Sequence, residues 1–116
     1  MAQLTDTLLQ QMVDAIVVEV DPEQVILFGS RAKGDAHEDS DVDLVVLESE
    51  PFEDGRSRHA EEVRLYSALS NFRVSKDILV YSHEEAEYWQ DSLNHVLARA
   101  LREGRVLYER RLPINA

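Results

Sequence analysis

Residues 28–34 read FGSRAKG, and residues 40–44 read SDVDL. The first segment follows the apolar run at 25–28, and the second leads into the apolar run at 42–47. Short continuous apolar runs are typical of strands that are buried on both faces. The two segments therefore predict two buried strands that are joined by a short polar loop.

Apolar residues elsewhere in the chain recur at helical spacing. Between residues 4 and 17 they form the stripe of an amphipathic helix, which we expect to end at Asp21 because Pro22 disfavours helical geometry in the residue before it. A second helix is predicted after the loop at 49–58. We expect its inner face to consist of Ala60, Val63, Tyr66 (or Leu65) and Leu69.

A strand and a capped helix are predicted in the last third of the chain. Residues 78–81 form another apolar run, and Ser82 with Glu85 fits the capping box that starts a helix. Helical spacing continues to Gly104, which should stop the helix before a short last strand at 106–108. Alternating helices and strands predict an α/β (α+β) fold, with helices packed on a small mixed β-sheet, in a single domain of residues 1–116.

The composition is that of an ordinary globular domain with a strong acidic bias. The 116 residues include 23 acidic and 12 basic side chains, and the net charge is −11. Residues 1–62 hold 16 of the acids but only 4 of the bases, so we expect no direct binding of nucleic acid, which needs cations to neutralise phosphates. The acidic half could suit a basic protein partner or bound cations, or only keep the chain soluble.

Two absences in the sequence narrow the function classes further. The chain contains no cysteine, which excludes disulfides, thiol catalysis and cysteine-based zinc sites. No apolar run approaches the roughly 18 residues of a membrane helix, and the first residues do not resemble a signal peptide. We therefore expect a cytoplasmic protein that does not bind membranes.

The segment at 28–34 has the features of a phosphate-binding turn. Gly29 allows a ligand to approach the backbone closely, and Ser30 opens what we expect to be one short helical turn. The free N–H groups at the start of a helix attract anions, and Arg31 adds a nearby cation.

Acidic residues supply the opposite charge. Asp41 and Asp43 stand two positions apart at the start of a strand, so their side chains point to the same face. Two carboxylates about 4 Å apart repel by roughly 4 kcal/mol at an effective dielectric of 20, and a divalent cation relieves this repulsion. Asp77, which opens the strand at 78–81, is the best third acid for a site of two Mg²⁺ ions. The poorer candidates, at a strand end or in a loop, are Glu48, Glu50, Glu53 and Asp54.

Either motif alone is more often turn chemistry than catalysis. Their conjunction strengthens the case, because both adjoin a hydrophobic strand and a third acid opens a later one. On spacing alone, a phosphate-and-metal site and an ordinary structural role both remain open.

Together, residues 29–34 and 40–44 resemble the signature of the DNA polymerase β-like nucleotidyltransferase superfamily. The short chain and its ending at 103–109 are similar to the minimal nucleotidyltransferase (MNT) proteins. The resemblance implies that Gly29 and Ser30 hold the nucleotide phosphates, and Arg31 and Ser40 complete the nucleotide-binding residues that we expect. It also implies that three carboxylates bind the metal and act in catalysis: Asp41, Asp43 and Asp77. Asp77 would in addition take the proton from the attacking hydroxyl.

The same resemblance implies a partner. MNT proteins are the antitoxins of HEPN/MNT toxin–antitoxin pairs, and they transfer AMP from ATP to a tyrosine of the RNA-cleaving HEPN toxin. The expectation is thus a Mg²⁺-dependent protein adenylyltransferase that forms a hetero-oligomer with its toxin. Two alternatives stay open: an antitoxin that neutralises its toxin by binding and occlusion, without catalysis, and an enzyme that adenylylates a small molecule.

Overall fold

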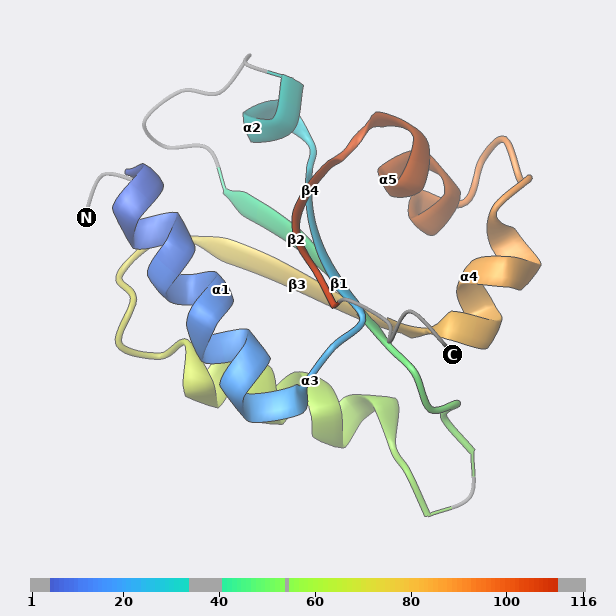
Figure 1. The fold of residues 1–116 in the computed structure, drawn as a ribbon, viewed down its shortest axis with the longest axis horizontal. Helices are drawn as coiled ribbons and strands as arrows, with labels where there is room; N and C mark the ends of the chain where they lie inside the picture. The colour runs from blue at the N-terminus through green and yellow to red at the C-terminus, as the bar shows by residue number, and fades with distance from the viewer. Residues whose placement is uncertain (1–4, 34–40, 54, 111–116) are drawn as a thin grey trace.

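The computed structural model describes residues 5–33, 41–53 and 55–110. Helices and strands alternate along these ranges (Figure 1). Their bounds are α1 (Asp6–Val20), β1 (Gln24–Phe28), α2 (Ser30–Lys33), β2 (Val42–Glu48), α3 (Arg58–Ala68), β3 (Lys76–Ser82), α4 (His83–Trp89), α5 (Val96–Glu103) and β4 (Arg105–Glu109). The strands form one mixed sheet in the order β3-β2-β1-β4. The predicted α/β class, with helices on a small mixed sheet, is confirmed.

The register of the strands aligns one residue from each of the three strands on the β3 side of the sheet. β1 pairs with β2 in antiparallel fashion, which places Phe28 opposite Asp43. β2 pairs with β3 in parallel fashion, which places Asp43 opposite Asp77. Because neighbouring strands lie about 4.8 Å apart, these positions form a short row across the sheet.

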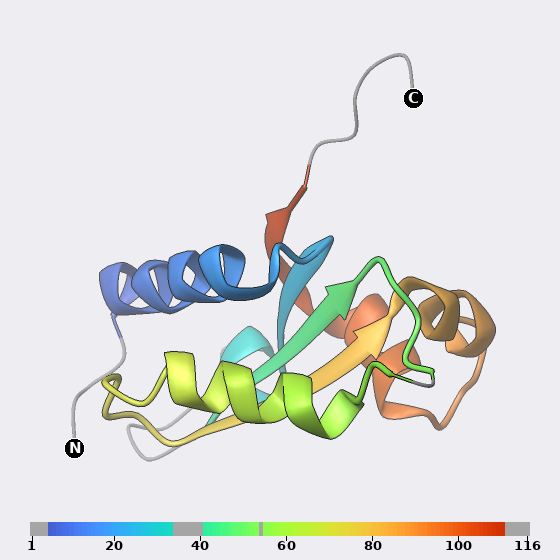
Figure 2. The same cartoon turned by 90° about the horizontal axis from the view of Figure 1, so that it is seen from below.

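The sheet lies between two pairs of helices. Figures 1 and 2 show α1 and α3 on one face and α4 and α5 on the other. Along β2, Leu44 and Val46 belong to the buried cluster that includes residues of α1 and α3. Val45 lies in the second cluster, with Leu97 of α5. Helices thus cover both faces of β2, which explains its continuous apolar run.

Side-chain caps fix the ends of several helices. The Thr5 hydroxyl accepts a hydrogen bond from the Leu8 N–H at the start of α1 (3.0 Å). Ser82 and Glu85 form the predicted capping box at the start of α4. Gly104 follows α5 directly, as expected. These local signals, each readable from sequence, set where the helices begin and end.

Two expectations about the helices need correction. Leu65 and Leu69 are buried as expected at α3 and its end, but Ala60 is exposed, Val63 is 53% exposed and the Tyr66 side chain is directed to the edge of the sheet. The single helix expected from 83 to 104 is interrupted between α4 and α5.

Two interactions stabilise the segment between α4 and α5, where the helix is interrupted. The rings of Trp89 and His95 stack with centroids 4.2 Å apart. Arg102 donates hydrogen bonds to the backbone carbonyls of Ser92 (2.8 Å) and Leu93 (3.3 Å). Both contacts connect residues that a continuous helix would place too far apart. The apolar residues keep a helical spacing across the break, so the spacing alone did not reveal it.

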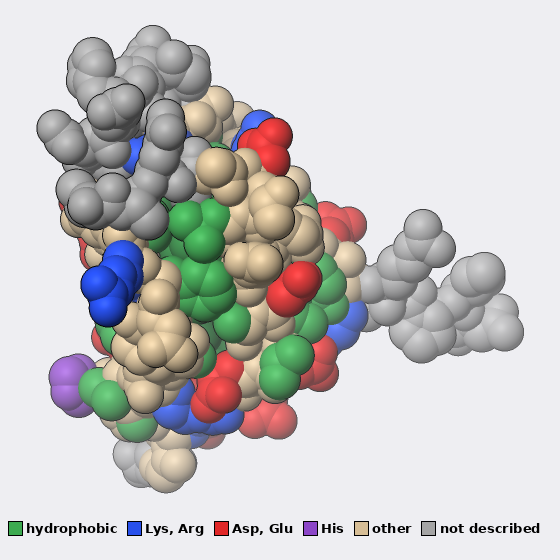
Figure 3. Space-filling model, turned by 90° about the vertical axis from the view of Figure 1, so that its left-hand side faces the viewer, with side chains coloured by type: hydrophobic (Ala, Val, Ile, Leu, Met, Phe, Trp, Pro, Cys, Tyr) green, Lys and Arg blue, Asp and Glu red, His purple; other side chains and the backbone are tan. Residues whose placement is uncertain are grey.

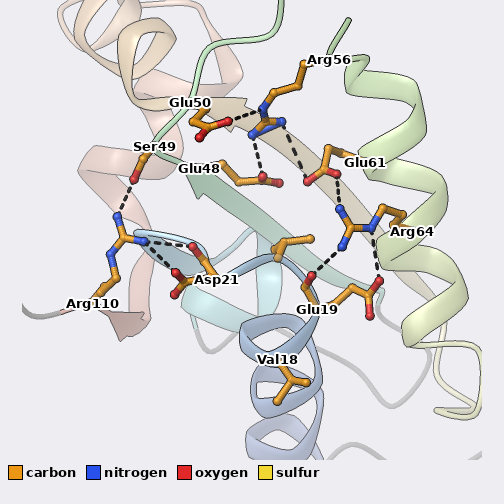
Figure 4. A pocket seen from close by; sticks show the side chains of 11 residues that line it. Val18, Glu19, Asp21, Glu48, Ser49, Glu50, Arg56, Glu61, Arg64 and Arg110 are labelled. Carbon is orange, nitrogen blue, oxygen red and sulfur yellow. Dashed lines mark hydrogen bonds and ion pairs between the residues drawn. The ribbon is translucent and has the colours of Figure 1, made fainter.

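A buried carboxyl pair lies at the far end of β2 from Asp43. Glu48 is only 4% exposed, and it lines a pocket of about 520 Å³ together with Glu61 and Arg64 of α3 (Figure 4). Arg56 donates to Glu48 Oε1 at 2.8 Å, but within the described residues no donor reaches Oε2. Burial, followed by a hydrogen bond and charge repulsion from Glu61, raises the pKa of Glu48 to about 8. The pair therefore carries a proton on Glu48 at neutral pH.

The proton on Glu48 makes stability depend on pH. An unfolded glutamate loses its proton near pH 4.5, so between that pH and about 8 the folded chain binds one more proton than the unfolded chain. The free energy of unfolding should therefore fall as the pH rises through this window. Glu48→Gln keeps an acceptor for Arg56 and a donor for Glu61, and at pH 8 we expect it to stabilise the fold by about 1 to 3 kcal/mol.

Urea unfolding of the parent chain and of Glu48→Gln between pH 5 and pH 9 measures this effect. The stabilisation should shrink toward pH 5. Glu50→Gln is the matched control, because the Glu50 side chain lies in the same pocket but is 80% exposed. A Glu48→Gln variant that is less stable than the parent at pH 8 would show that Glu48 is ionised in the fold.

Candidate active site

Three of the residues singled out in the sequence meet at one end of the sheet. Gly29 follows the last residue of β1, and Asp43 and Asp77 are register partners in β2 and β3. Register partners in parallel strands point to the same face of the sheet. Asp43 stands two residues before Val45, so its side chain points to the same face as Val45, which packs in the cluster with Leu97 of α5. The two carboxylates therefore share the α5 face, next to the turn that leads from β1 into α2.

Gly29 leaves a space beside its Cα that the Asp43 carboxylate occupies. Its backbone has a φ of +74°, a left-handed conformation that favours glycine. A Cβ at this position would lie 2.4 Å from Asp43 Oδ2, which is closer than any real contact. Glycine therefore suits the turn, and any larger residue here would push the Asp43 carboxylate aside.

The acids interact electrostatically. Burial raises the pKa of Asp43, and the neighbouring charges of Asp77 and Asp41 raise it further. The carboxylates of Asp41 and Asp77 are therefore close enough to Asp43 to disfavour its ionised form. This position favours a neutral carboxyl or a nearby positive charge.

Two polar residues that the sequence reading missed hold the outer acids. Ser75 Oγ donates a hydrogen bond to Asp41 Oδ1. Tyr66 Oη donates to Asp77 Oδ1 at 3.4 Å and accepts from the Ile78 N–H at 2.9 Å. The parallel pairing of β2 and β3 brings Ser75 to Asp41, and only the position of α3 brings Tyr66 to Asp77. No sequence signal at Tyr66 distinguished this role from the core position that we expected.

The nucleotide-binding residues expected from the sequence are placed only in part. The short helix α2 begins at Ser30, immediately after Gly29, and contains Arg31. Its first N–H groups are thus presented at the end of β1, beside Asp43. Ser40 lies outside the described residues, so its expected role stays a prediction.

The donor chemistry of the site suits magnesium, although the three acids do not form a ready-made cluster. Within the ranges that the structure describes, no three Asp, Glu or His side chains are gathered closely enough to hold a metal ion as they stand. Asp43 and Asp77 nevertheless offer adjacent carboxylate oxygens, the ligands that Mg²⁺ prefers, at a position that favours positive charge. Asp41, now hydrogen-bonded to Ser75, could add a third carboxylate.

A pocket of about 280 Å³ opens beside Gly29. It lies between the end of β1 and α5, on the face that carries Asp43. The residues that line it are Phe28, Gly29, Asn94, Val96, Arg99, Ala100 and Glu103. The lining combines aromatic and apolar side chains with the Asn94 amide and with the ion pair between Arg99 and Glu103, and it offers space for part of an organic ligand.

The surface near this end of the molecule is mixed in charge. On the described part of the face shown in Figure 3, Lys and Arg side chains are scattered among acidic and apolar ones.

Of the helices in the described ranges, none has both the length and the apolar composition needed to cross a bilayer.

Comparison with known structures finds the same fold in other proteins. A Sulfolobus solfataricus protein described as a nucleotidyltransferase matches over 90% of this chain and 79% of its own, with a TM-score of 0.63 and 19% identity. A toxin–antitoxin structure with AMP-PNP matches over 93% of this chain and 76% of its own (TM-score 0.52, 21% identity). The structure of a mutant of the toxin–antitoxin MntA-HpeT matches over 93% of this chain and 76% of its own, with a TM-score of 0.51 and 19% identity.

Comparison of the sequence gives the family. No curated protein matches this chain. The family model "Polymerase beta, Nucleotidyltransferase" matches residues 10–111, a range that includes the Gly29 turn, Asp43 and Asp77. Since this match covers most of the 116 residues, the chain belongs to the polymerase beta nucleotidyltransferase family.

Proposed function

We propose that this chain is a Mg²⁺-dependent nucleotidyltransferase that acts as an antitoxin, transferring AMP from ATP to a tyrosine hydroxyl of a cognate HEPN toxin. The observation that carries the proposal is the alignment of Asp43 with Asp77 beside the Gly29 turn. Family membership supports the transferase class. The toxin–antitoxin neighbours, one of them with AMP-PNP, support the nucleotide and the kind of partner.

In this proposal the turn after β1 binds the triphosphate. The left-handed turn at Gly29 leads the chain directly into α2, and the N–H groups at the start of α2 donate to the phosphate oxygens. Ser30, Arg31 and Ser40 complete the nucleotide-binding residues. The pocket lined by Phe28 and Asn94 lies close enough to receive another part of the nucleotide.

The acids bind the metal and handle the proton. Asp41, Asp43 and Asp77 would hold Mg²⁺, two ions in the full site, which when bound offsets the charge of the phosphates and of the attacking oxygen. Asp77 accepts the proton of the acceptor hydroxyl. That oxygen then attacks the α-phosphorus, the bond from this phosphorus to the bridging oxygen breaks, and pyrophosphate leaves.

A toxin partner would supply the acceptor. The toxin–antitoxin neighbours support a partner of this kind. We propose that the surface which presents the acceptor tyrosine comes from this second protein, in a cytoplasmic hetero-oligomer.

The test is to incubate the purified chain and its partner with labelled ATP and Mg²⁺. The partner should acquire AMP on a tyrosine, and chelation of the metal should stop the reaction. If the partner stays unlabelled under conditions in which the complex forms, protein adenylylation is refuted.

A double variant separates catalysis from occlusion. Asp41→Asn/Asp43→Asn should lose both labelling and neutralisation of the toxin. Neutralisation that survives this change, and that does not depend on ATP, would instead show an antitoxin that acts by covering its toxin, in keeping with the acidic first half of the chain.

A further inference from the structure

The Tyr66 hydroxyl is held at the free edge of the sheet, next to Asp77. β3 is the outermost strand on its side, so the Ile78 N–H has no strand partner there. Tyr66 Oη accepts a hydrogen bond from this N–H at 2.9 Å. Its own proton points to Asp77 Oδ1, at 3.4 Å. A side chain of α3 thus fixes a hydroxyl group on the carboxylate that we propose as the base.

This is the position that an acceptor hydroxyl must reach. For transfer, the attacking oxygen has to lie within hydrogen-bond reach of the group that takes its proton. Tyr66 is 38% exposed, so its side chain is only partly covered by the rest of the chain. The hydroxyl needs a base in order to attack, and the Asp77 carboxylate lies within reach to act as one.

We propose that Tyr66 is itself an acceptor, and that the chain transfers AMP from ATP to its own Tyr66 hydroxyl. This inference rests on the proposed function. Tyr66 Oη forms a bond to the α-phosphorus of ATP, the bond between this phosphorus and the bridging oxygen breaks, and pyrophosphate leaves. The proton of the hydroxyl passes to Asp77. The products are one AMP-tyrosine ester and one pyrophosphate.

The geometry sets the stoichiometry and the kinetic order. One hydroxyl per chain is in place, so labelling should stop at one AMP per chain. Because Tyr66 and Asp77 belong to the same molecule and are already in contact, the rate per molecule should not depend on protein concentration. Transfer between two copies would instead accelerate with concentration.

The experiment uses the purified full chain alone, with labelled ATP and Mg²⁺. Intact mass measures the number of AMP groups, and peptide mapping locates them. We expect one group on Tyr66, at a rate unchanged over a hundredfold dilution. Tyr88 is the internal control, because it is 77% exposed and lies on α4, away from Asp43 and Asp77.

A mixing experiment checks that transfer is intramolecular. Asp43→Asn keeps the acceptor but lacks a catalytic carboxylate, and Tyr66→Phe keeps the carboxylates but lacks the acceptor. A mixture of the two should leave both chains unlabelled. Labelling of Asp43→Asn in the mixture would overturn the intramolecular step.

A measurement without nucleotide or metal tests the placement of Tyr66. The Ile78 amide should exchange its hydrogen slowly in the parent chain and at least tenfold faster in Tyr66→Phe. Equal exchange rates in the two chains would show that Tyr66 does not hold this edge, and the inference would fall.

The outcomes also separate this inference from the proposed function. AMP on Tyr88 or another residue, or an unlabelled chain that nevertheless labels the partner's tyrosine, overturns self-transfer and leaves the proposed function intact. A chain that labels neither itself nor the partner overturns both.

Discussion

Asp43→Asn should lower the rate of nucleotide transfer about a thousandfold, because it removes a charged ligand at the centre of the site. The same change should make the fold more stable. Burial and the charges of Asp77 and Asp41 raise the pKa of Asp43, so its ionised form is disfavoured in the folded chain. A neutral amide of the same shape escapes this repulsion, and we expect a gain on the order of 1 kcal/mol at pH 7.

The pH dependence of this gain has a defined sign. Above the ordinary pKa of 3.8 the unfolded chain has lost the Asp43 proton, while the folded chain retains part of it. The stability of the parent chain therefore falls as the pH rises above this value, and the advantage of Asp43→Asn should grow in the same direction. Urea unfolding and labelled-ATP transfer measure the two effects, with the exposed Asp91→Asn as control.

Opposite changes in activity and stability are the signature of a functional carboxylate. An Asp43→Asn variant that loses stability together with activity would indicate instead that Asp43 is a structural residue. Full activity in the variant would exclude Asp43 from the reaction.

Gly29→Ala should reduce nucleotide transfer by a factor of about 100 or more. The new methyl group would lie 2.4 Å from Asp43 Oδ2, so the carboxylate has to move away. A displacement of about 1 Å in a reacting group is enough for a loss of this size. The left-handed backbone should add a destabilisation of about 1 to 2 kcal/mol.

Gly55→Ala is the matched control for Gly29→Ala. Gly55 has a φ of +88°, so alanine should suffer a similar backbone strain, but no atom lies within 4 Å of the added Cβ. Gly55→Ala should therefore lose stability and keep its activity. If both variants lose activity equally, the contact between Gly29 and Asp43 has no part in catalysis.

Sequence patterns predicted the parts of the fold that depend on local chemistry. The apolar runs around Val45 and Leu79 became central and edge strands, and the Ser82–Glu85 capping box starts α4 as expected. The approach of Asp77 to Asp43 was expected if their strands were neighbours, and the parallel register of β2 and β3 makes them neighbours.

What the sequence left out depends on packing between distant segments. Helical spacing left Tyr66 and Leu65 as alternatives for the core. Leu65 is the buried one, and the placement of α3 against β3 directs the Tyr66 hydroxyl to the Ile78 N–H. Glu48 was considered only as a poor metal ligand at a strand end. Its burial with Glu61 and its high pKa arise because α3 covers that end of β2. Likewise, Asp41 meets Ser75 only once β2 and β3 have paired.

A crystal structure of the chain with Mg²⁺ and a non-hydrolysable ATP analogue is the most direct test of the site. The triphosphate should lie on the N–H groups at the start of α2, with carboxylate oxygens of Asp43 and Asp77 about 2.1 Å from the same magnesium ion. A nucleotide bound elsewhere, such as the pocket beside Glu48 and Arg56, with no metal between these two aspartates, would contradict the assignment.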